Sequence, residues 1–177
     1  MQAGLDPSCL IFIDETWIKT NMTRLRGWAL CGQRIVEKVP HGHWKTTTVI
    51  AAMDQRGMRC SMTLDGPVNR NAFEAFVQKI LCPSIKAGDI VVMDNLSSHK
   101  GNRVKELIEL AGATVLYLPP YSPDLNPIEP AFSKFKQLVR SAGHRVMDIL
   151  WGDLQRMLDQ INTSDAEGFF SHCGYGR

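Results

Sequence analysis

The sequence predicts an α/β fold in which a mixed sheet, antiparallel at first and parallel afterwards, is flanked by helices. Three observations predict it: β-rich segments in the first third of the chain, a strand-helix-strand pattern over Asp89–Leu118, and helical periodicity beyond residue 127. The chain has 177 residues, which suits one domain. Because it contains no internal repeat and no linker, we expect residues 1–177 to form a single domain.

The antiparallel part is predicted from four segments near the amino terminus. Cys9–Ile13 is a continuous apolar run that ends at an acid, which is typical of a strand buried on both faces. Further β-rich runs lie near Gly27–Val39, Thr46–Met53 and Met58–Leu64, and the last precedes a turn-forming Asp-Gly-Pro. Together these runs predict a meander.

The parallel part is predicted from alternating helical and β patterns. Asn71–Leu81 has apolar residues at spacings of three and four, which indicates a helix with one buried stripe. Asp89–Met93 then predicts a buried strand, Ser98–Ala111 a helix and Thr114–Leu118 a second strand. A helix between two strands is typical of a crossover that leaves the strands parallel.

The remaining segments are an irregular loop and two helical regions. The four prolines of residues 119–127 each lack an N–H and fix φ, so this segment is expected to be irregular. Pro127–Ala142 predicts a helix whose apolar face packs on the sheet. The acidic stretch 148–167 is also expected to be helical, with an apolar face over Ile149–Ile161 that packs on the sheet or on a partner.

Composition excludes several classes of protein. The chain is 44% apolar and 21% charged, and it has neither an 18-residue apolar run nor a positively headed leader, which argues against membrane-spanning and secreted proteins. Its five cysteines form no C-x-x-C pair, so neither a disulfide framework nor a zinc ribbon is supported. We expect a cytoplasmic protein, associated with the nucleoid when it acts on DNA.

The small net charge of +2 hides an uneven distribution. Trp17–Lys45 contains six basic residues against Glu37 alone, whereas the region from Asp148 onward contains five acids against two bases. This asymmetry indicates an anionic partner for one face of the protein.

Aromatic residues are interleaved with these bases. Trp17, Trp28 and Trp44 either stack on unpaired bases of DNA or belong to the core of the meander, the commoner place for tryptophan. The nearby His41-Gly-His43 has the spacing of a metal-ligand pair, but it lacks the third ligand that a zinc site needs.

Three acids are candidates for chemistry. Asp14 and Asp94 each follow an apolar strand, so each is expected at a strand's carboxyl end, where open α/β sheets place their sites. Either acid alone is also typical of a turn or a helix cap. Glu129 has an alternative role too, because Asn126 as N-cap and Pro127 as first helical residue would put it in a capping box.

Taken together, converging carboxylates bind hard divalent cations such as Mg²⁺ or Mn²⁺. Two such ions about 4 Å apart stabilise the attacking and leaving oxygens of a phosphoryl transfer. The residues therefore favour metal-assisted phosphoryl transfer without a covalent nucleophile. The cluster Ser97-Ser98-His99 is as typical of a helix start as of a catalytic triad.

These acids lie in three recognisable blocks, Phe12–Trp17, Val92–Lys100 and Pro120–Glu129, and 34 residues intervene between Asp94 and Glu129. The blocks resemble those of the DDE transposases of the IS six-thirty, Tc-one and mariner superfamily, most specifically in the run Y-S-P-D-L-N-P-I-E. The resemblance spans about residues 10–140. It implies a ribonuclease-H-like fold, with Asp14, Asp94 and Glu129 as the catalytic and metal-binding triad for two Mg²⁺ or Mn²⁺ ions.

The resemblance further implies cut-and-paste transposition of an insertion sequence. Water cleaves DNA at the ends of the element, and the freed 3′-hydroxyl attacks target DNA, generally at TA. The implied partners are transposon ends, target DNA and a second copy of the chain in the DNA complex. Family members also carry an amino-terminal helix-turn-helix region, but only thirteen residues precede Asp14. We therefore expect that region to be absent and a separate recognition chain to supply it.

Two alternatives to a transposase remain at this point. One is a related nuclease, such as a junction resolvase or ribonuclease H, which hydrolyses strands and never joins them. The other is a non-catalytic DNA-binding remnant, which the short amino-terminal region favours.

The expected DNA contacts come from the basic segment, the second block and the helix predicted over Pro127–Ala142. Lys136 and Arg140 share a helix stripe with Glu129, which suits either a phosphate track or an ordinary solvated face. The second-block residues either contact the scissile phosphate or begin a helix. The complete set is Lys19, Arg24, Arg26, His43, Lys45, His99, Lys100, Lys136 and Arg140.

Overall fold

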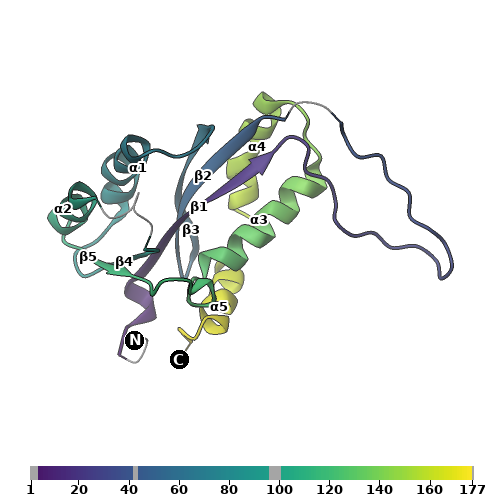
Figure 1. Cartoon of the computed structure of the whole chain (residues 1–177). Helices are drawn as coiled ribbons and strands as arrows, with labels where there is room; N and C mark the ends of the chain where they lie inside the picture. Colours follow the sequence, from purple (N-terminus) through teal and green to yellow (C-terminus); the bar gives the residue numbers. More distant parts are fainter. Residues whose placement is uncertain (1–3, 42–43, 96–100, 177) are drawn as a thin grey trace.

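The computed structural model describes residues 4–41, 44–95 and 101–176, and its centre is a five-stranded mixed sheet (Figure 1). The strand order is β3-β2-β1-β4-β5; β3, β2 and β1 pair antiparallel, whereas β1, β4 and β5 pair parallel. The strands are β1 (Leu10–Lys19), β2 (Thr46–Asp54), β3 (Gly57–Asp65), β4 (Ile90–Met93) and β5 (Thr114–Tyr117). This arrangement confirms the α/β class, the mixed sheet and the crossover.

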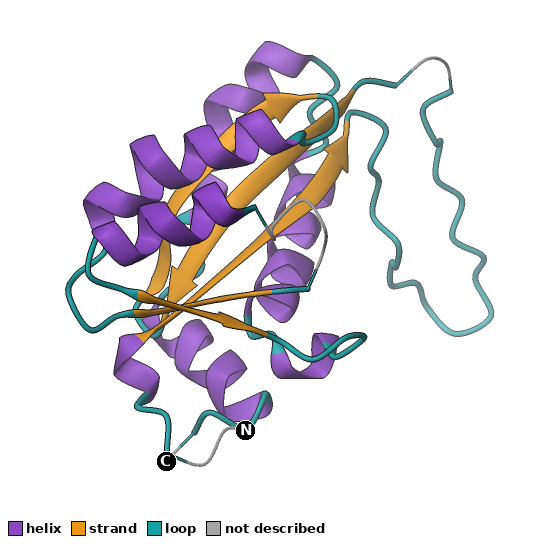
Figure 2. Ribbon diagram, turned by 60° about the vertical axis from the view of Figure 1, so that its left-hand side comes forward, coloured by secondary structure: helices purple, strands orange, loops and turns teal. Residues whose placement is uncertain are grey.

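Helices cover both faces of the sheet (Figure 2). One face packs on α1 (Arg70–Phe76), the π-helical turn η2 (Val77–Leu81) and α2 (Asn102–Leu110). The other face packs on α3 (Ile128–Ala142), α4 (Met147–Leu158) and α5 (Thr163–His172). Short 3₁₀ turns are η1 (Pro7–Cys9), η3 (Cys82–Ser84) and η4 (Pro123–Leu125). In the described part of the chain, no helix combines the length and the apolar character needed to cross a bilayer.

The strand predicted near Gly27–Val39 is wrong. Residues 24–39 are exposed and belong to a long connection between β1 and β2, which Figure 1 shows projecting from the body. We call residues 20–45 the arm. Its described residues from 23 to 41 make one backbone hydrogen bond among themselves, from Gln33 N to Leu30 O. β-propensity did not suffice, because a strand also needs a partner and a face that packs.

The first strand is longer than predicted. It does not end at Asp14 but continues to Lys19, because β2 pairs with it antiparallel from Phe12 to Lys19. Its parallel partner β4 stops earlier, and the last parallel pair is Ile13 with Met93. Asp14 and Asp94 therefore lie at the end of the parallel pairing, although only Asp94 follows the end of a strand.

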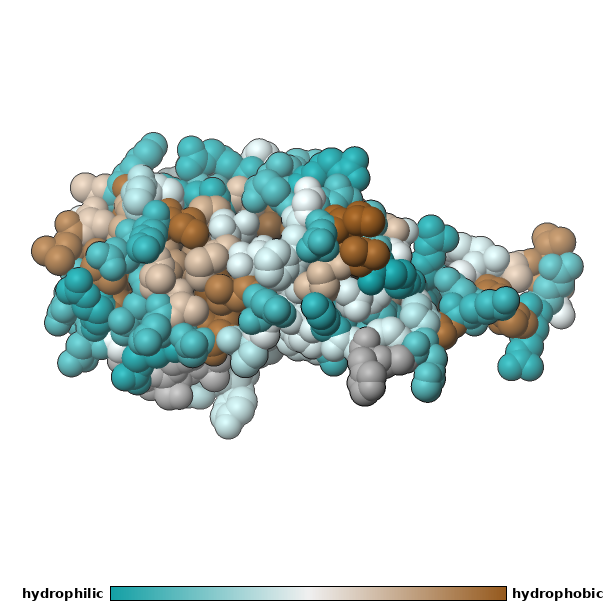
Figure 3. Space-filling view, turned by 90° about the horizontal axis from the view of Figure 1, so that it is seen from above, coloured by the Kyte–Doolittle hydropathy of each residue, from teal (hydrophilic) through white to brown (hydrophobic). Residues whose placement is uncertain are grey.

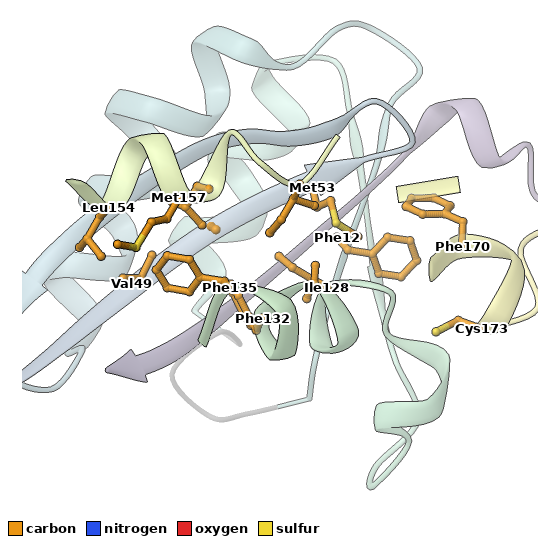
Figure 4. Close-up of a cluster of buried hydrophobic side chains, with 14 of the residues drawn as sticks. Phe12, Val49, Met53, Ile128, Phe132, Phe135, Leu154, Met157, Phe170 and Cys173 are labelled. Carbon is orange, nitrogen blue, oxygen red and sulfur yellow. The ribbon is translucent and has the colours of Figure 1, made fainter. Parts of the chain in front are cut away.

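The larger core lies between the sheet and helices α3, α4 and α5 (Figure 4). Phe12 of β1 packs edge-on against Phe170 of α5, with ring centroids 5.3 Å apart, and Phe132 and Phe135 of α3 are buried beside it. Each such burial contributes about 1.5–3 kcal/mol. This core fixes α3, and with it Glu129, against the sheet.

The acidic carboxyl-terminal region forms two helices where one was expected. The break falls between Asp159 and Asn162, because Asn162 caps α5 through a capping box with Asp165. Leu150, Leu154 and Leu158 are buried on the sheet as expected, whereas Ile149 is exposed. The apolar face thus packs on the chain's own core.

Candidate active site

The three predicted acids lie around one cavity of about 360 Å³. Asp14 comes from the middle of β1, Asp94 from the residue after β4, and Glu129 from the first turn of α3. The sheet brings the first two together, because their preceding residues, Ile13 and Met93, are direct parallel partners. The expected convergence of the three carboxylates is confirmed.

Asp14 is the buried member of this group, with 8% of its surface exposed. Its Oδ1 accepts a hydrogen bond from Glu15 N at 2.7 Å, and its Oδ2 accepts one from Asn126 Nδ2 at 2.8 Å. Burial raises the pKa of Asp14 to about 7, and the charges of Glu129 and Asp94 add to the shift. A cation at this place would reverse the shift, since it favours the ionised carboxylate.

Asn126 does not act as the predicted N-cap. Pro127 occupies the N-cap position of α3, and no side chain caps this helix end. The Asn126 side chain reaches instead to Asp14, while only its backbone oxygen accepts from Glu129 N. The capping-box alternative for Glu129 is therefore wrong, because Asn126 is buried toward the cavity and its amide bonds a charged partner there.

The proline-rich loop forms the rest of the cavity wall. It contains the turn η4, and its Tyr121 has a φ of 56°, which is rare outside glycine, with its side chain exposed at the cavity. At the far end of the chain, Tyr175 Oη donates to Leu125 O at 2.9 Å. The carboxyl-terminal segment thus supports the loop residue that precedes Asn126.

The donor set suits a hard divalent cation. All three acids offer carboxylate oxygens, and Asn126 Oδ1, which lies in the same cavity wall, is a buried amide oxygen that no donor reaches within the described residues. In that same part of the chain, no three His, Cys, Asp or Glu side chains already form a compact ligand set. These residues would therefore hold a hard divalent cation, which would supply Lewis-acid chemistry to a substrate oxygen.

Two of the predicted DNA-contact residues meet at one aromatic ring. Lys19 and Lys136 place their ammonium groups over the ring of Trp17, at 5.0 and 5.2 Å from its centroid. Burial lowers the pKa of Lys136, and the charges of Glu129 and Asp14 oppose that shift. A half-exposed aromatic ring flanked by two cations suits a nucleotide, because it combines stacking with phosphate attraction.

Three further predicted contacts gather in a second cavity. Arg24 and Arg26 of the arm and Arg140 of α3 line a space of about 340 Å³. Lys45 is exposed just before β2 and lines neither cavity. His43, His99 and Lys100, together with the Ser97-Ser98-His99 cluster, lie outside the described residues.

Sequence reasoning missed the role of Asn126, and of its two alternatives for the tryptophans the favoured one, burial in the core, is wrong. Trp17 is 54% exposed, Trp28 is fully exposed and Trp44 lies at the surface, so none belongs to the core of the meander. The signal for Asn126 was its position two residues before the helix, beside a proline that needs no N–H partner. The same position is also typical of an ordinary helix cap.

Solved structures of a transposase have the same fold. The catalytic domain of Mos1 mariner transposase matches with a TM-score of 0.65 and 18% identity, over 96% of this chain and 79% of that one. The Mos1 mariner paired end complex with Mn matches with a TM-score of 0.68 and 20% identity, over 96% of this chain and 54% of that one. The Mos1 strand transfer complex matches with 0.67 and 20%, over 94% and 50%.

This chain thus spans about half the length of the Mos1 chains in the DNA complexes. No curated protein matches its sequence significantly. The fold predicted from the resemblance is confirmed.

Membership of a family follows from the sequence itself. The model of the DDE superfamily endonuclease family matches residues 9–150, which include β1 through α3 and all three acids of the cavity. With these acids converging at the end of the parallel pairing, the chain belongs to the DDE superfamily of endonucleases.

Proposed function

We propose that this chain is the catalytic domain of a transposase, which cleaves DNA strands and joins them to a target during cut-and-paste transposition of an insertion sequence. The observation that carries the proposal is the convergence of Asp14, Asp94 and Glu129 on one cavity in a chain of the DDE endonuclease superfamily. The fold shared with the Mos1 strand transfer complex and paired end complex supports transposition over other reactions of the superfamily.

In this proposal the three acids hold divalent cations. When bound, such cations polarise the scissile phosphodiester, lower the pKa of water and stabilise the charge that develops on the leaving oxygen. Asp14 contributes a carboxylate already fixed by two hydrogen bonds, one to each oxygen. Glu129 lies in the first turn of α3, which packs on the sheet and so holds this residue at the cavity.

Charge balance favours two cations over one. Three carboxylates and one phosphodiester carry four negative charges, which two divalent ions neutralise in a partly buried cavity. Mg²⁺ and Mn²⁺ both suit an all-oxygen donor set. Complexes of Mos1 with Mg and with Mn support the same choice.

The reaction then proceeds by two displacements of the same kind. Water attacks phosphorus at the end of the element, the bond from phosphorus to the 3′-oxygen breaks, and that oxygen leaves as a 3′-hydroxyl. The hydroxyl attacks a target phosphodiester, forms a new bond to phosphorus and releases a target 3′-hydroxyl. Each step exchanges one phosphodiester oxygen for another, so no covalent protein intermediate is required.

Transposition also requires partners. We propose DNA ends and target DNA as substrates, a second copy of the chain in the DNA complex, and a separate recognition chain for the terminal repeats. The basic arm and the cations around Trp17 support the DNA partner. The setting would be the cytoplasm, on the nucleoid.

A strand-joining assay tests the proposal. A duplex with a labelled, recessed 3′-hydroxyl end is incubated with the protein, supercoiled plasmid and Mn²⁺ or Mg²⁺. We expect label to become covalently attached to the plasmid, and we expect Asp14→Asn, Asp94→Asn and Glu129→Gln each to abolish attachment while circular dichroism stays unchanged.

The matched controls are Asp65→Asn and Glu106→Gln, which alter exposed acids on β3 and α2 outside the cavity. Both should retain joining. Plasmid nicking without attachment would identify a hydrolytic nuclease of the same superfamily. Joining that survives loss of any one of the three acids would refute the assigned triad.

A further inference from the structure

The second cavity lies between the root of the arm and α3 and has a volume of about 340 Å³. Arg24 and Arg26 line it from the arm, and Ser133, Gln137, Arg140 and Ser141 line it from α3. We call these six residues the arginine groove. We propose that the arginine groove binds a backbone phosphate of the DNA strand whose scissile bond lies at the three acids, which rests on and extends the proposed function.

The charged side chains of the arginine groove favour binding of an anion. Its wall contains three guanidinium groups and no acid. Among the described residues, none of the three arginines joins an ion pair, whereas Arg56, Arg59 and Arg156 each bind a neighbouring aspartate. Like charges gathered in one cavity repel one another, and a bound anion relieves that repulsion.

The donors of the groove match a phosphodiester. Guanidinium groups bind phosphate oxygens with two parallel hydrogen bonds, which is why arginine is common in phosphate sites. The hydroxyls of Ser133 and Ser141 and the amide of Gln137 add neutral donors on the helix side. With donors on both sides, the groove can hold both non-bridging oxygens of one phosphate.

The arginine groove lies farther along α3 from the acid Glu129. Glu129, Ser133 and Gln137 recur at every fourth residue of α3, so they lie along one side of the helix. At about 1.5 Å per residue, the centre of the groove near Gln137 is about 12 Å along the helix axis from Glu129. In a duplex that runs along α3, nucleotides advance by about 3.4 Å each, so the bound phosphate would lie roughly three to four nucleotides from the scissile bond.

The root of the arm is anchored where it forms the groove. Arg145, which follows α3, donates through Nη1 to the backbone oxygens of Thr20 and Met22, both at 2.9 Å. Arg24 and Arg26 come two and four residues after Met22. Figure 3 shows the arm leaving the body with hydrophilic and hydrophobic side chains exposed along it. The arginine pair is thus held at the body, while the remainder of the arm projects from it.

A salt titration of DNA affinity tests the groove. A fluorescent duplex with a recessed 3′ end is titrated with the protein by anisotropy in Ca²⁺ across a salt series. We expect Arg24→Ala and Arg140→Ala each to weaken binding about tenfold. In each variant, the fall of log affinity with log salt should also be less steep, by about 1 in slope. Arg140→Lys keeps the positive charge but lacks the planar guanidinium that makes two parallel hydrogen bonds. It should therefore keep the salt dependence and lose part of the affinity.

The matched control is Arg103→Ala, which removes an exposed arginine from α2 on the other face of the sheet. It should change neither affinity nor slope, and thermal melting by circular dichroism should confirm that all variants fold. If the wild type binds DNA but the slopes of the Arg24 and Arg140 variants equal its own, the groove proposal is overturned and the proposed function stands. If the wild type binds no DNA, the proposed function fails as well.

The location is tested with neutral methylphosphonate linkages at successive positions from the recessed end. In the wild type, the neutral linkage should reduce DNA affinity most at the third to fourth phosphate. In Arg140→Ala, a neutral linkage at that position should reduce affinity no more than at other positions, because both changes affect one contact. Additive losses would overturn the assignment. Inorganic phosphate is titrated separately, and binding that disappears in Arg140→Ala while the DNA slope is unchanged would identify a free-anion site instead.

Discussion

Asn126 Nδ2 donates a hydrogen bond of 2.8 Å to Asp14 Oδ2, although the two residues are 112 positions apart in the sequence. Both side chains are buried, and Glu15 N donates to the other oxygen of Asp14. The bond joins the start of α3 to the central strand. It therefore fixes the Asp14 carboxylate and the helix that carries Glu129 relative to each other.

Removal of the Asn126 amide should weaken binding of the catalytic cation. In Asn126→Ala, Asp14 loses one of the two donors that orient it. Residues that orient metal ligands typically contribute 10–100-fold to affinity or activity. We expect the Mg²⁺ concentration for half-maximal strand joining to rise by about that factor. The measurement is a Mg²⁺ titration of joining at fixed pH.

The control for this prediction is Asn69→Ala, which removes the side-chain cap of α1 at Ala72 N. It should lower stability by about 1 kcal/mol and leave the Mg²⁺ dependence unchanged. Asn126→Asp adds a fourth acid to the cavity and should raise the pKa of Asp14 further. An unchanged Mg²⁺ requirement in Asn126→Ala would show that Asp14 is oriented by the backbone alone.

The pKa of Asp14, raised to about 7, predicts how the metal-free protein responds to pH. Between about pH 4, where an unfolded aspartate ionises, and pH 7, the folded state binds a proton that the unfolded state does not. Stability therefore falls as pH rises through this window. The loss is at most about 4 kcal/mol, because each unit of pKa shift corresponds to about 1.4 kcal/mol.

Urea unfolding at several pH values with EDTA measures this effect. Asp14→Asn removes the titrating group, so the difference in unfolding free energy between variant and wild type should grow from pH 4 to pH 7.5. Saturating Mg²⁺ should restore wild-type stability at the upper end, since the cation compensates the charge. A difference that is independent of pH would mean that Asp14 ionises normally.

Much of this fold follows from patterns that a single segment displays. The apolar run before Asp14, the crossover over 89–118 and the helix from residue 128 all depend on local periodicity, and each appears where it was expected. The wrong predictions concern segments whose structure depends on a pairing strand. Gly27–Val39 has β-propensity but forms no strand, and the strand end at Asp14 could not be located without knowing that β2 pairs beyond it.

In the candidate site, too, some features can be predicted from one segment of sequence, whereas others depend on contacts with distant residues. The three acids could be found because their blocks are specific in sequence, and the sheet register then brings Asp14 and Asp94 together. The role of Asn126 could not be found, because the same residue type at the same position also serves as a helix cap. Only its contact with a residue on a distant strand decides between the two roles.

The arm should be the first part of the chain that a protease cleaves. Its described residues 24–39 are exposed and make one backbone hydrogen bond among themselves, so cleavage there needs no unfolding of the core. Limited trypsin digestion should cut first at Arg34 or Lys38, as mass spectrometry of the fragments will show. The two fragments should stay associated through the β1–β2 pairing.

Bound DNA provides the control for this digestion. If the arm root contacts a phosphate, saturating duplex should protect Arg24 and Arg26 more than Lys38, which lies farther along the arm. Cleavage that begins instead within α2 or α4 would contradict the assignment of the arm as the least protected part of the described chain.

The hairpin between β2 and β3 should tolerate no side chain at Gly57. This residue has a φ of +124°, and a Cβ there would lie 2.5 Å from the backbone oxygen of Ile161, in the connection between α4 and α5. Both the backbone conformation and the contact oppose alanine, and backbone at Ile161 cannot withdraw as a flexible side chain would. We expect Gly57→Ala to lower the free energy of urea unfolding by about 2–4 kcal/mol.

Gly66→Ala is the matched control, because Gly66 also has a positive φ, +85°, but open space around it. It should cost about 1–2 kcal/mol, from backbone strain alone. Equal losses in the two variants would mean that the close approach of Ile161 contributes nothing to the loss at Gly57.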